Sequence, residues 1–448
     1  MKKIIEKALA KGVERAEVFF FENLRTDVDY EAGKLRSLAD TEERGAALRV
    51  VKDGKLGFAT TTKLDDVGGL VDNAIATAAE GEPVTFEFSS AADVPTPSIT
   101  DERIETLSVD DMMKDSEQAI ARVNDYESRI NIGSGTARQR QHLGVATCRG
   151  FEGEFERTTY EFYVGGMLLD GTSMLHTGAS FSGTTLDVDH GELTARAIEK
   201  FDKARKNVDI APGRMTVVLT PRAVADIFLT LALGVNGLYV DERISPLAGR
   251  LGETILDERI TIRDDGTRAG GFFSAAFDDE GVPMGETTVF ENGVLRSYLT
   301  DRRTAAKLDH PLTGNGLKAK RLIQSKELGK VPSPETTSWV MEGGETPYEE
   351  LLGAVGSGVL VDSIMGIIMA NLAAGDFSGN LMYALKIEDG KTVGRVKDTM
   401  ISGNVYELLR DNVVGLSKEV HRTGVLGGIG SHWYPYIVLK DVSIAAKS

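Results

Sequence analysis

The chain contains a single cysteine, Cys148, among its 448 residues. One cysteine excludes an internal disulfide framework and is typical of a protein kept in a reducing compartment. Cys148 lies in the alternating run ATCRGFEGEF, and no histidine pattern accompanies it. We therefore expect a small buried thiol rather than a nucleophile.

Positive charge is scarce, because 51 Lys and Arg stand against 68 Asp and Glu and give a net charge of −17. An acidic surface repels phosphate backbones, so direct nucleic-acid binding is not expected. Long apolar runs are also missing: the longest, residues 364–374, is about half of what a bilayer requires. The N-terminal residues lack the continuous apolar core of a signal peptide. The sequence predicts a soluble, cytoplasmic protein that does not enter a membrane.

Metal-ligand spacings are absent among the histidines. The six are His142, His176, His190, His310, His421 and His432. No two stand at HxxxH or HxH spacing, so surface or structural histidines are expected. His432 lies in the aromatic stretch SHWYPY, which favours packing or a substrate contact. No GxxxxGK[ST] or GxSxG motif occurs, and the glycines of residues 424–430 precede a strand-like run, which disfavours a nucleotide loop.

The composition, 41% hydrophobic and 27% charged, is ample for a large core and predicts two or three domains. Proline-containing linkers divide the chain into residues 1–82, 104–206 and 213–446. The first unit has the order helix, strands, helix, and the second has antiparallel strands plus helices. The third has many turn signals. The predicted fold class is α+β, with a mixed α/β N-terminal half of two small units and a β-rich C-terminal domain.

Turn and cap signals support this division. Asp53-Gly54 predicts a tight hairpin in the first unit, since both central residues of a type I′ turn need positive φ. Ser108 with Asp111 predicts a helix start in the second unit. The pairs Asp265-Gly266, Asn292-Gly293 and Asp389-Gly390 predict hairpins in the third unit. These turns make the last unit hairpin-rich.

The third unit contains the most informative series of motifs. An apolar strand, residues 215–219, precedes a helix-like run, residues 224–233, and the acidic turn FDDEG at 277–281. The motifs FDDEGVP, ENGVL, TGNG (313–316), GDFSGN (375–380) and ISGNVYELL (401–409) follow in the order found in the TldD/PmbA family. The chain resembles this family over about its last half. Its members were once called modulators of DNA gyrase and are now regarded as metallopeptidase subunits.

Two kinds of chain occur in that family. The TldD kind carries HExxxH on the helix after the first strand and a late cysteine, and the PmbA (TldE) kind lacks them. Alignment on the strand VVLTP places the two histidine positions on Leu229 and Gly234, the glutamate position on Thr230 and the cysteine position on Leu426. None of these side chains can ligate zinc or act as a strong base at pH 7. The chain resembles the PmbA kind.

The resemblance implies a metal-free subunit of a zinc metallopeptidase that cleaves peptides or unfolded segments. No catalytic or metal-binding residue is expected in this chain, and zinc would sit in a TldD-like, HExxxH-bearing partner. A homodimer is a further expectation. Two alternatives stay open: a self-sufficient hydrolase with a site that no motif reveals, or a non-enzymatic binding protein that regulates another protein.

The family loops supply candidate substrate-binding residues. They are Asp278, Asp279, Glu280, Thr313, Gly314, Asn315, Asp376 and Ser378. Three adjacent carboxylates could also hold a cation, but Asp and Gly favour β-turns, and a polar turn is the preferred interpretation. The two glycines of TGNG would let another chain approach closely, although a simple loop is as plausible.

The helix-like run carries a structural prediction of its own. In HExxxH the two histidines lie about 140° apart on an ideal helix. They share one metal only where the helix widens or ends. A chain without the metal has no reason for that distortion, and its positions can become apolar. We predict an undistorted, largely buried helix over residues 224–233, with Gly234 ending it.

Overall fold

The computed structural model describes residues 1–171, 173–319, 327–424 and 431–446. Its N-terminal lobe is a six-stranded antiparallel sheet in the order β3-β2-β1-β4-β5-β6. The strands are β1 (Arg15–Glu31), β2 (Lys34–Lys52), β3 (Lys55–Thr61), β4 (Ile130–Thr147), β5 (Glu152–Asp170) and β6 (Ser173–Gly183). The helices are α1 (Lys2–Ala10), α2 (Val67–Ala78), α3 (Glu102–Thr106), α4 (Val109–Tyr126) and α5 (His190–Lys203).

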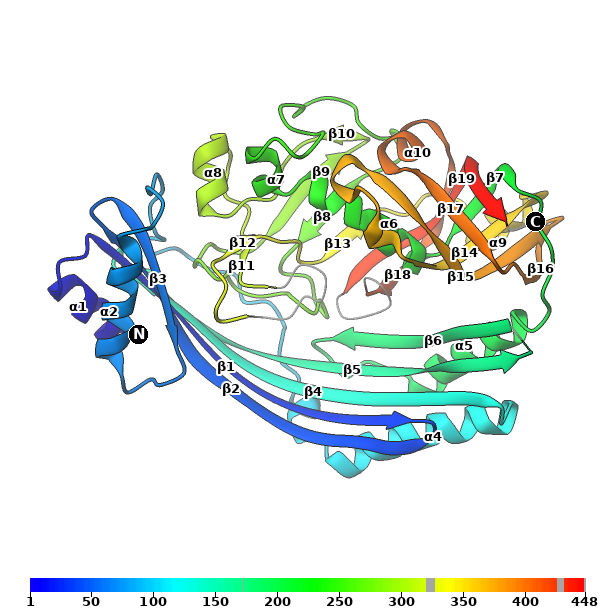
Figure 1. The fold of residues 1–448 in the computed structure, drawn as a ribbon, viewed down its shortest axis with the longest axis horizontal. Coiled ribbons are helices and arrows are strands. Elements are labelled where there is room, and N and C mark those ends of the chain that lie inside the picture. Colours follow the sequence, from blue (N-terminus) through cyan, green and yellow to red (C-terminus); the bar gives the residue numbers. More distant parts are fainter. Residues whose placement is uncertain (172, 320–326, 425–430, 447–448) are drawn as a thin grey trace.

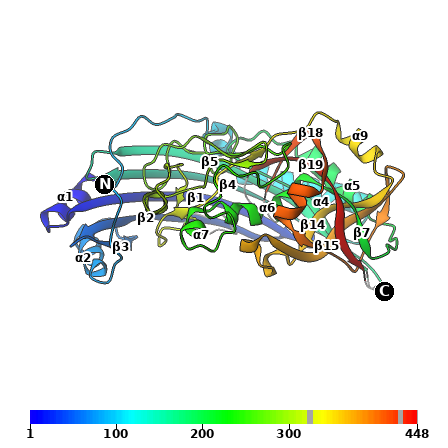
Figure 2. The same ribbon diagram turned by 90° about the horizontal axis from the view of Figure 1, so that it is seen from above.

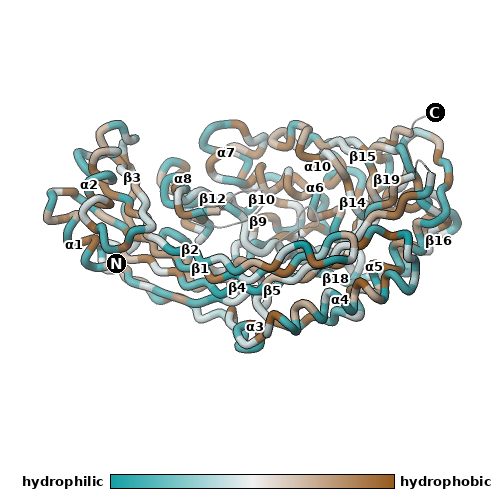
Figure 3. Tube along the Cα trace, turned by 60° about the horizontal axis from the view of Figure 1, so that its bottom comes forward, coloured by the Kyte–Doolittle hydropathy of each residue, from teal (hydrophilic) through white to brown (hydrophobic). Residues whose placement is uncertain are grey.

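This sheet is long and curved (Figure 1). Helices α1 and α2 lie at one end, α4 runs along the side away from the C-terminal lobe, and the chain termini lie near opposite ends (Figure 2). Hydrophilic and hydrophobic residues are interspersed along the long strands (Figure 3). Burial alternates residue by residue along parts of β1 and β5, as expected for a sheet with two different faces. The strands predicted for the first unit include two long ones, β1 of 17 residues and β2 of 19 residues.

The predicted boundary between the first two units does not separate two sheets. Strands β1 to β3 come from residues 1–82 and β4 to β6 from residues 104–206, yet β1 pairs with β4 along fourteen positions from Glu17↔Thr147 to Tyr30↔Ser134. The residues between them form a connection beside the sheet. The N-terminal half is one lobe in space, built from two segments of sequence.

The C-terminal lobe is organised by a mixed 11-stranded sheet. Its strands are β7 (Gly213–Leu219), β8 (Ile262–Asp265), β9 (Glu286–Glu291), β10 (Val294–Leu295), β13 (Trp339–Met341), β14 (Ser357–Met365), β15 (Asp376–Glu388), β16 (Lys391–Arg395), β17 (Thr399–Asn404), β18 (Val413–Thr423) and β19 (His432–Ala446). A small separate pair joins β11 (Gly316–Leu317) and β12 (Ser333–Pro334). The predicted α+β class, with a β-rich C-terminal domain, is confirmed.

Short helices cover this sheet. They are α6 (Pro221–Gly234), α7 (Gly237–Asp241), α8 (Arg302–Leu308), α9 (Tyr348–Gly353), α10 (Val405–Asp411) and the 3₁₀ turns η1 (Ile367–Met369) and η2 (Leu372–Ala374). The main core of the lobe forms where α6 packs on β7, β14 and β19. A second core contains residues of both lobes, including Phe201 of α5 and Leu385 of β15, so the two lobes share buried apolar surface.

Three predicted turns are confirmed by positive φ at both central residues: Asp53-Gly54, Asn292-Gly293 and Asp389-Gly390. The hairpin predicted at Asp265-Gly266 is wrong. Strand β8 ends there, but its antiparallel partner β9 starts only at Glu286. The intervening residues 266–285 leave the sheet and carry the acidic FDDEG turn.

The predicted helix start at Ser108 is confirmed, whereas Cys148 is less buried than predicted. Ser108 is the N-cap of α4, and its side chain accepts a hydrogen bond from the Asp111 amide, as predicted. Cys148 is half-buried rather than fully buried, and its Sγ accepts from the Ala16 amide at 3.4 Å. No helix in the described parts of the chain is both long and apolar enough to cross a bilayer.

Candidate functional site

Helix α6 begins and ends where the sequence indicates. Thr220 is its N-cap and accepts from the Ala223 amide at 3.4 Å, while Pro221 occupies the first turn, where a missing N–H costs nothing. The helix continues without interruption to Gly234, and ten of its residues are buried. The prediction of a regular, largely buried helix over residues 224–233 is confirmed.

Three positions of α6, 229, 230 and 234, correspond to the HExxxH residues of the TldD kind. Each has a different environment. Leu229 is half-buried at the edge of a small pocket. Thr230 is fully buried, and its hydroxyl donates to the Ile227 carbonyl at 2.7 Å. At Gly234, an added Cβ would overlap the hydroxyl oxygen of Tyr406 and lie 3.3 Å from a Leu247 methyl group. The fourth position, Leu426, lies outside the described residues.

Tyr406 brings three of the family motifs together. It follows Asn404, whose side chain caps α10, and its ring packs against both Gly234 and Gly375. Gly375 has φ of +90°, so this position needs a glycine for its backbone as well as for the space beside Tyr406. Burial raises the pKa of Tyr406, and its hydroxyl has no hydrogen-bond partner among the described residues. A side chain therefore occupies the space that any larger residue at 234 would need.

A pocket of about 60 Å³ lies beside α6. Its described lining is Ala225, Phe228, Leu229, Ala232, Leu233, Asn236, Leu299, Glu335, Thr336, Trp339, Leu372, His432 and Tyr434. The predicted aromatic setting of His432 is confirmed, since its ring stacks on Tyr434 and Tyr434 packs edge-on against Phe228. The helix and the aromatic setting of His432 were predictable from the sequence, but the pocket that they share was not.

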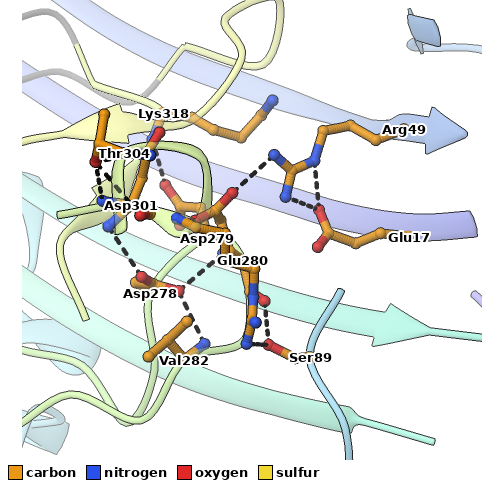
Figure 4. Close-up of polar contacts among 12 residues, drawn as sticks. Glu17, Arg49, Ser89, Asp278, Asp279, Glu280, Val282, Asp301, Thr304 and Lys318 are labelled. Carbon is orange, nitrogen blue, oxygen red and sulfur yellow. Dashed lines mark hydrogen bonds and ion pairs between the residues drawn. The ribbon is translucent and has the colours of Figure 1, made fainter. Parts of the chain in front are cut away.

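The acidic turn is buried rather than open, and Figure 4 shows its polar contacts. Asp278, Asp279 and Glu280 are at most 3% exposed. Asp278 accepts from the amides of Glu280, Val282 and Gly316, each at 2.9 Å, and Asp279 accepts from the Lys318 amide at 2.6 Å. Burial raises the pKa of Asp278, with the nearby Glu280 adding to the rise. These hydrogen bonds fix the turn against the TGNG loop.

Glu280 joins the turn to the N-terminal sheet. Its carboxylate accepts from Arg49 of β2 at 2.7 Å and from the Arg302 amide at 2.7 Å (Figure 4). Arg49 also bonds Glu17 of β1 through Nε at 2.8 Å, and Ser89 donates to the Glu280 carbonyl at 2.6 Å. Burial raises the pKa of Glu17 despite the neighbouring Arg49. The turn is therefore part of a buried joint between the two lobes.

The TGNG loop belongs to the same joint. Asn315 is 1% exposed and donates to Asp264 at 2.6 Å and to the Glu335 carbonyl at 2.9 Å. Thr313 bonds the backbone of Thr300 in both directions, at 2.8 and 3.2 Å. Gly314 has φ of +72°, and an added Cβ there would lie 2.8 Å from a carbonyl oxygen of the FDDEGVP stretch. The two loops thus pack directly on one another.

Asp376 and Ser378 lie elsewhere, on β15 beside α10. Asp376 is exposed and accepts from the Asn404 side chain at 3.0 Å, and Ser378 is half-buried. The structure brings the residues of positions 278–280 and 313–315 together and leaves this pair apart. Contact of any of the eight with substrate stays a prediction.

A much larger cavity, of about 1250 Å³, lies between the N-terminal sheet and the C-terminal lobe. It is lined by strands β5 and β6, helix α5 and the edge of β14 and β15. On its wall, Asp362 binds Lys200 at 2.7 Å and Thr220 at 3.0 Å, with Arg222 at 3.9 Å. Burial opposes the charge on Asp362, but Lys200 and Arg222 outweigh it, and its pKa lies below the usual value. These residues come from α5, β14 and the start of α6 and have no spacing pattern, so the sequence does not reveal the group.

Within residues 1–171, 173–319, 327–424 and 431–446, no three His, Cys, Asp or Glu side chains are grouped so that they could hold a metal ion. The described positions where the family resemblance places metal ligands or the base do not fit zinc. Leu229 is apolar, the Thr230 hydroxyl is committed to the backbone, and Gly234 leaves no room for a side chain.

The fold and these motifs define a class of two-lobed metallopeptidase-related chains. Residues 212–446 match the PmbA/TldA metallopeptidase C-terminal domain, and residues 16–80 match PmbA/TldA metallopeptidase domain 1. The chain therefore belongs to the PmbA/TldD metallopeptidase family, which confirms the resemblance found in its motifs.

Relatives cover nearly the whole chain. An uncharacterized protein of Methanocaldococcus jannaschii is 25% identical over 416 residues, which are 92% of this chain and 94% of that one. A metalloprotease of Methanothermobacter thermautotrophicus is 27% identical over 401 residues, 86% of this chain and 84% of that one. The crystal structure of TldE from Thermococcus kodakarensis superposes with a TM-score of 0.89 at 23% identity and covers all of both chains. The last likeness establishes the same fold.

Proposed function

We propose that this chain is the metal-free subunit of a zinc metallopeptidase that cleaves peptides or unfolded segments. In this proposal the chain holds the substrate in the cytoplasm, and a TldD-like, HExxxH-bearing partner carries the zinc. The observation that carries the proposal is the occupation of the space beside Gly234 by Tyr406. A histidine at 234 would need both the ring and the hydroxyl of Tyr406 to move.

The state of α6 supports the same conclusion. A helix that must aim two histidines about 140° apart at one ion needs a local distortion. Helix α6 has none, and Thr230, at the position of the family glutamate, faces the core with its hydroxyl bonded to the preceding turn. Substitution at one position would not restore such a site, because the backbone and the supporting contacts are also different.

The large cavity supports a substrate-holding function. Its volume of about 1250 Å³ exceeds that of ordinary small-molecule sites, which reach about 1,000 Å³. It has side chains of both charges, such as Arg196 and Glu199, beside the aromatic residues Tyr383 and Tyr436. Such a mixed wall suits an extended peptide better than a single small metabolite.

The exposed part of β2 supports a partner. From residue 34 to 44 both faces of this strand are exposed, and β3 pairs only with its second half, from Ala46 onward. Leu35 and Leu38 are 46% and 51% exposed. A long strand with one free edge and exposed leucines invites pairing with another chain. A TldD-like chain fits this surface, and a second copy of the same chain would compete for it.

The proposal is tested by purifying the chain alone, a HExxxH-bearing family member from the same genome alone, and the two together. Each preparation is assayed for zinc content and for cleavage of an unfolded protein, with and without a chelator. We expect less than about 0.1 zinc per chain and no cleavage from this chain alone, and chelator-sensitive cleavage from the pair.

Three results would overturn the proposal. About one zinc per chain in this protein alone would show a metal site of its own, and cleavage by the chain alone would make it a self-sufficient hydrolase. Full cleavage by the HExxxH-bearing partner alone, only raised or lowered when this chain binds, would identify a regulatory protein instead. A version of the partner whose HExxxH glutamate is replaced by glutamine serves as the matched control for contaminating peptidases.

A further inference from the structure

We propose that Arg222, beside Lys200 and Asp362 on the wall of the large cavity, forms a binding site for a carboxylate group of a peptide. The inference deepens the proposed function by naming the charge of the group that the chain holds. It rests on that function only for the identification of the carboxylate as part of a peptide.

Three elements meet at this part of the cavity wall. Lys200 lies on α5, Asp362 on β14 and Arg222 in the first turn of α6, and all three residues line the cavity. The Asp362 side chain is 6% exposed, whereas the Lys200 and Arg222 side chains are 26% and 29% exposed. A ligand in the cavity therefore meets the two cations rather than the carboxylate.

Both oxygens of Asp362 have nearer partners than Arg222. Oδ2 accepts from the Lys200 ammonium at 2.7 Å, and Oδ1 accepts from the Thr220 hydroxyl at 3.0 Å. Arg222 approaches Oδ2 only to 3.9 Å, which is beyond hydrogen-bond distance.

The Arg222 guanidinium therefore keeps its donors. It donates no hydrogen bond to any residue in the described chain. Only its Nε atom is fully enclosed, so the two terminal nitrogens retain accessible surface. Four of the five N–H groups of a guanidinium are on these terminal nitrogens, and they can reach an acceptor in the cavity.

The other cations of α5 on this wall have carboxylate partners of their own. Arg196 pairs with Glu192 and Lys203 pairs with Glu199, in each case one turn away on the same helix. None of the residues outside the described ranges has an acidic side chain. Lys200 and Arg222 thus have only Asp362 to share.

The charge of this group is not balanced. Burial alone would raise the pKa of Asp362, but Lys200 and Arg222 lower it below its usual value, so the carboxylate is charged at pH 7. One negative charge offsets one of the two cations. About one positive charge is left on a wall that faces the cavity, and a partly buried charge is stabilised by an opposite one.

A single surplus charge favours a carboxylate over a phosphate. Arginine binds carboxylates through two parallel hydrogen bonds, which are about twice as strong as bonds between neutral groups. The N-terminal end of α6, where Arg222 lies, adds a partial positive charge of about one half. A phosphate group with a charge of about −1.5 to −2 would exceed the surplus.

The cations are held in place before a ligand arrives. Tyr383 donates to the Lys200 carbonyl at 3.0 Å, and the Lys200 Nζ atom lies 5.8 Å from the centre of the Tyr383 ring. Arg222 follows Pro221, whose ring fixes the backbone at the start of the helix. A site with fixed donors loses less entropy on binding.

The test measures peptide binding to the isolated, full-length chain by isothermal titration calorimetry. The uncharged reference is the N-acetylated pentapeptide Ala-Thr-Ala-Thr-Ala with a C-terminal amide. Four further probes carry a free C-terminal carboxylate, or the amide with glutamate, glutamine or phosphoserine in the centre.

We expect at least one of the two carboxylate peptides to bind about tenfold more tightly than its neutral counterpart. This preference should shrink as salt is added. The peptide that shows it identifies a chain terminus or an acidic side chain as the source of the carboxylate.

Three substitutions locate the site. Arg222→Gln removes the surplus charge and should abolish the preference, whereas Asp362→Asn uncovers a second cation and should increase it. Arg36→Gln removes the same charge from the part of the cavity lining on β2 and should leave the preference unchanged. Thermal melts confirm folding of each variant, and Arg222→Met replaces Arg222→Gln if the latter does not fold.

Equal affinity for charged and neutral peptides, no binding of any probe, or an unchanged preference in the Arg222 variant would overturn the inference. An equal loss in Arg36→Gln would show a general effect of charge and would also overturn it. Tighter binding of the phosphoserine peptide than of both carboxylate peptides would overturn the assignment of the ligand.

The assay needs neither a partner nor peptidase activity, so its failure leaves the proposed function to the zinc and cleavage measurements. Conversely, an inactive complex with an intact carboxylate preference would reject the proposed function and not the site.

Discussion

The acidic turn at 277–281 and helix α6 differ in a way that their sequences conceal. The turn holds three adjacent carboxylates and is buried, with its oxygens taken by backbone amides and by Arg49. Helix α6 presents the apolar residues Leu229, Ala232 and Leu233, yet these residues line a small pocket. The charged segment forms a buried contact between the two lobes, and the apolar helix lines a pocket.

The difference follows from the energetics of burial. A buried charge is tolerated only with partners close by, so the residues around it must be specific and numerous. Apolar side chains impose no such demand, and the space beside them depends on how neighbouring elements happen to pack. The dense charge of the acidic turn therefore marks a buried contact between the lobes. The pocket beside α6, in contrast, has no pattern in the local sequence.

Arg49→Met should have the largest effect, because it leaves Glu17 and Glu280 buried without their shared cation. The expected loss in free energy of unfolding is about 3–5 kcal/mol, measured by urea denaturation. The matched control is Arg250→Met, which breaks an exposed pair with Glu253 and should cost less than about 1 kcal/mol. Equal losses of unfolding free energy for the two variants would contradict a structural role for the acidic turn between the lobes.

His432, which lines the pocket beside α6, should make the free energy of unfolding depend on pH. Burial lowers its pKa to about 4 in the folded chain, against about 6.5 when unfolded, so the unfolded state binds the extra proton first. Its contribution to stability is complete above pH 6.5 and is lost as the pH falls towards 4, by about 3 kcal/mol. Unfolding of the His432→Gln variant should lack this component. Parallel pH profiles for variant and native protein would contradict a buried neutral ring.

Gly234→Ala should have a smaller effect that depends on Tyr406. The new Cβ meets the Tyr406 hydroxyl, and such overpacking costs about 1–3 kcal/mol. In the Tyr406→Phe background the cost should fall, since the offending oxygen is gone. Tyr406→Phe alone should be neutral or slightly stabilising, because that hydroxyl has no partner in the described chain. A double-mutant cycle by thermal denaturation measures the coupling, and additive effects would show that Tyr406 does not close the site.

Local features of the fold could be predicted from single segments. Helix α6, the N-cap at Ser108 and the turn at Asn292-Gly293 depend on φ preferences and on side chains a few residues apart. The family motifs were also read correctly, because they are contiguous in sequence. The prediction of a hairpin at Asp265-Gly266 was wrong, because the same residue pair can begin a long loop as readily as a tight turn.

The α+β class, the regular helix after the first strand of the C-terminal domain and the loss of ligand-type side chains at Leu229, Thr230 and Gly234 could be inferred from residue types and their order alone. The folded chain was needed to see that Tyr406 fills the space at 234 and that Arg49 reaches Glu280 across 231 positions of sequence. It was also needed to see that both halves of the N-terminal region share one sheet. The physical reason is range: backbone preferences act within a few residues, whereas packing and charge burial join segments whose distance in sequence carries no signal.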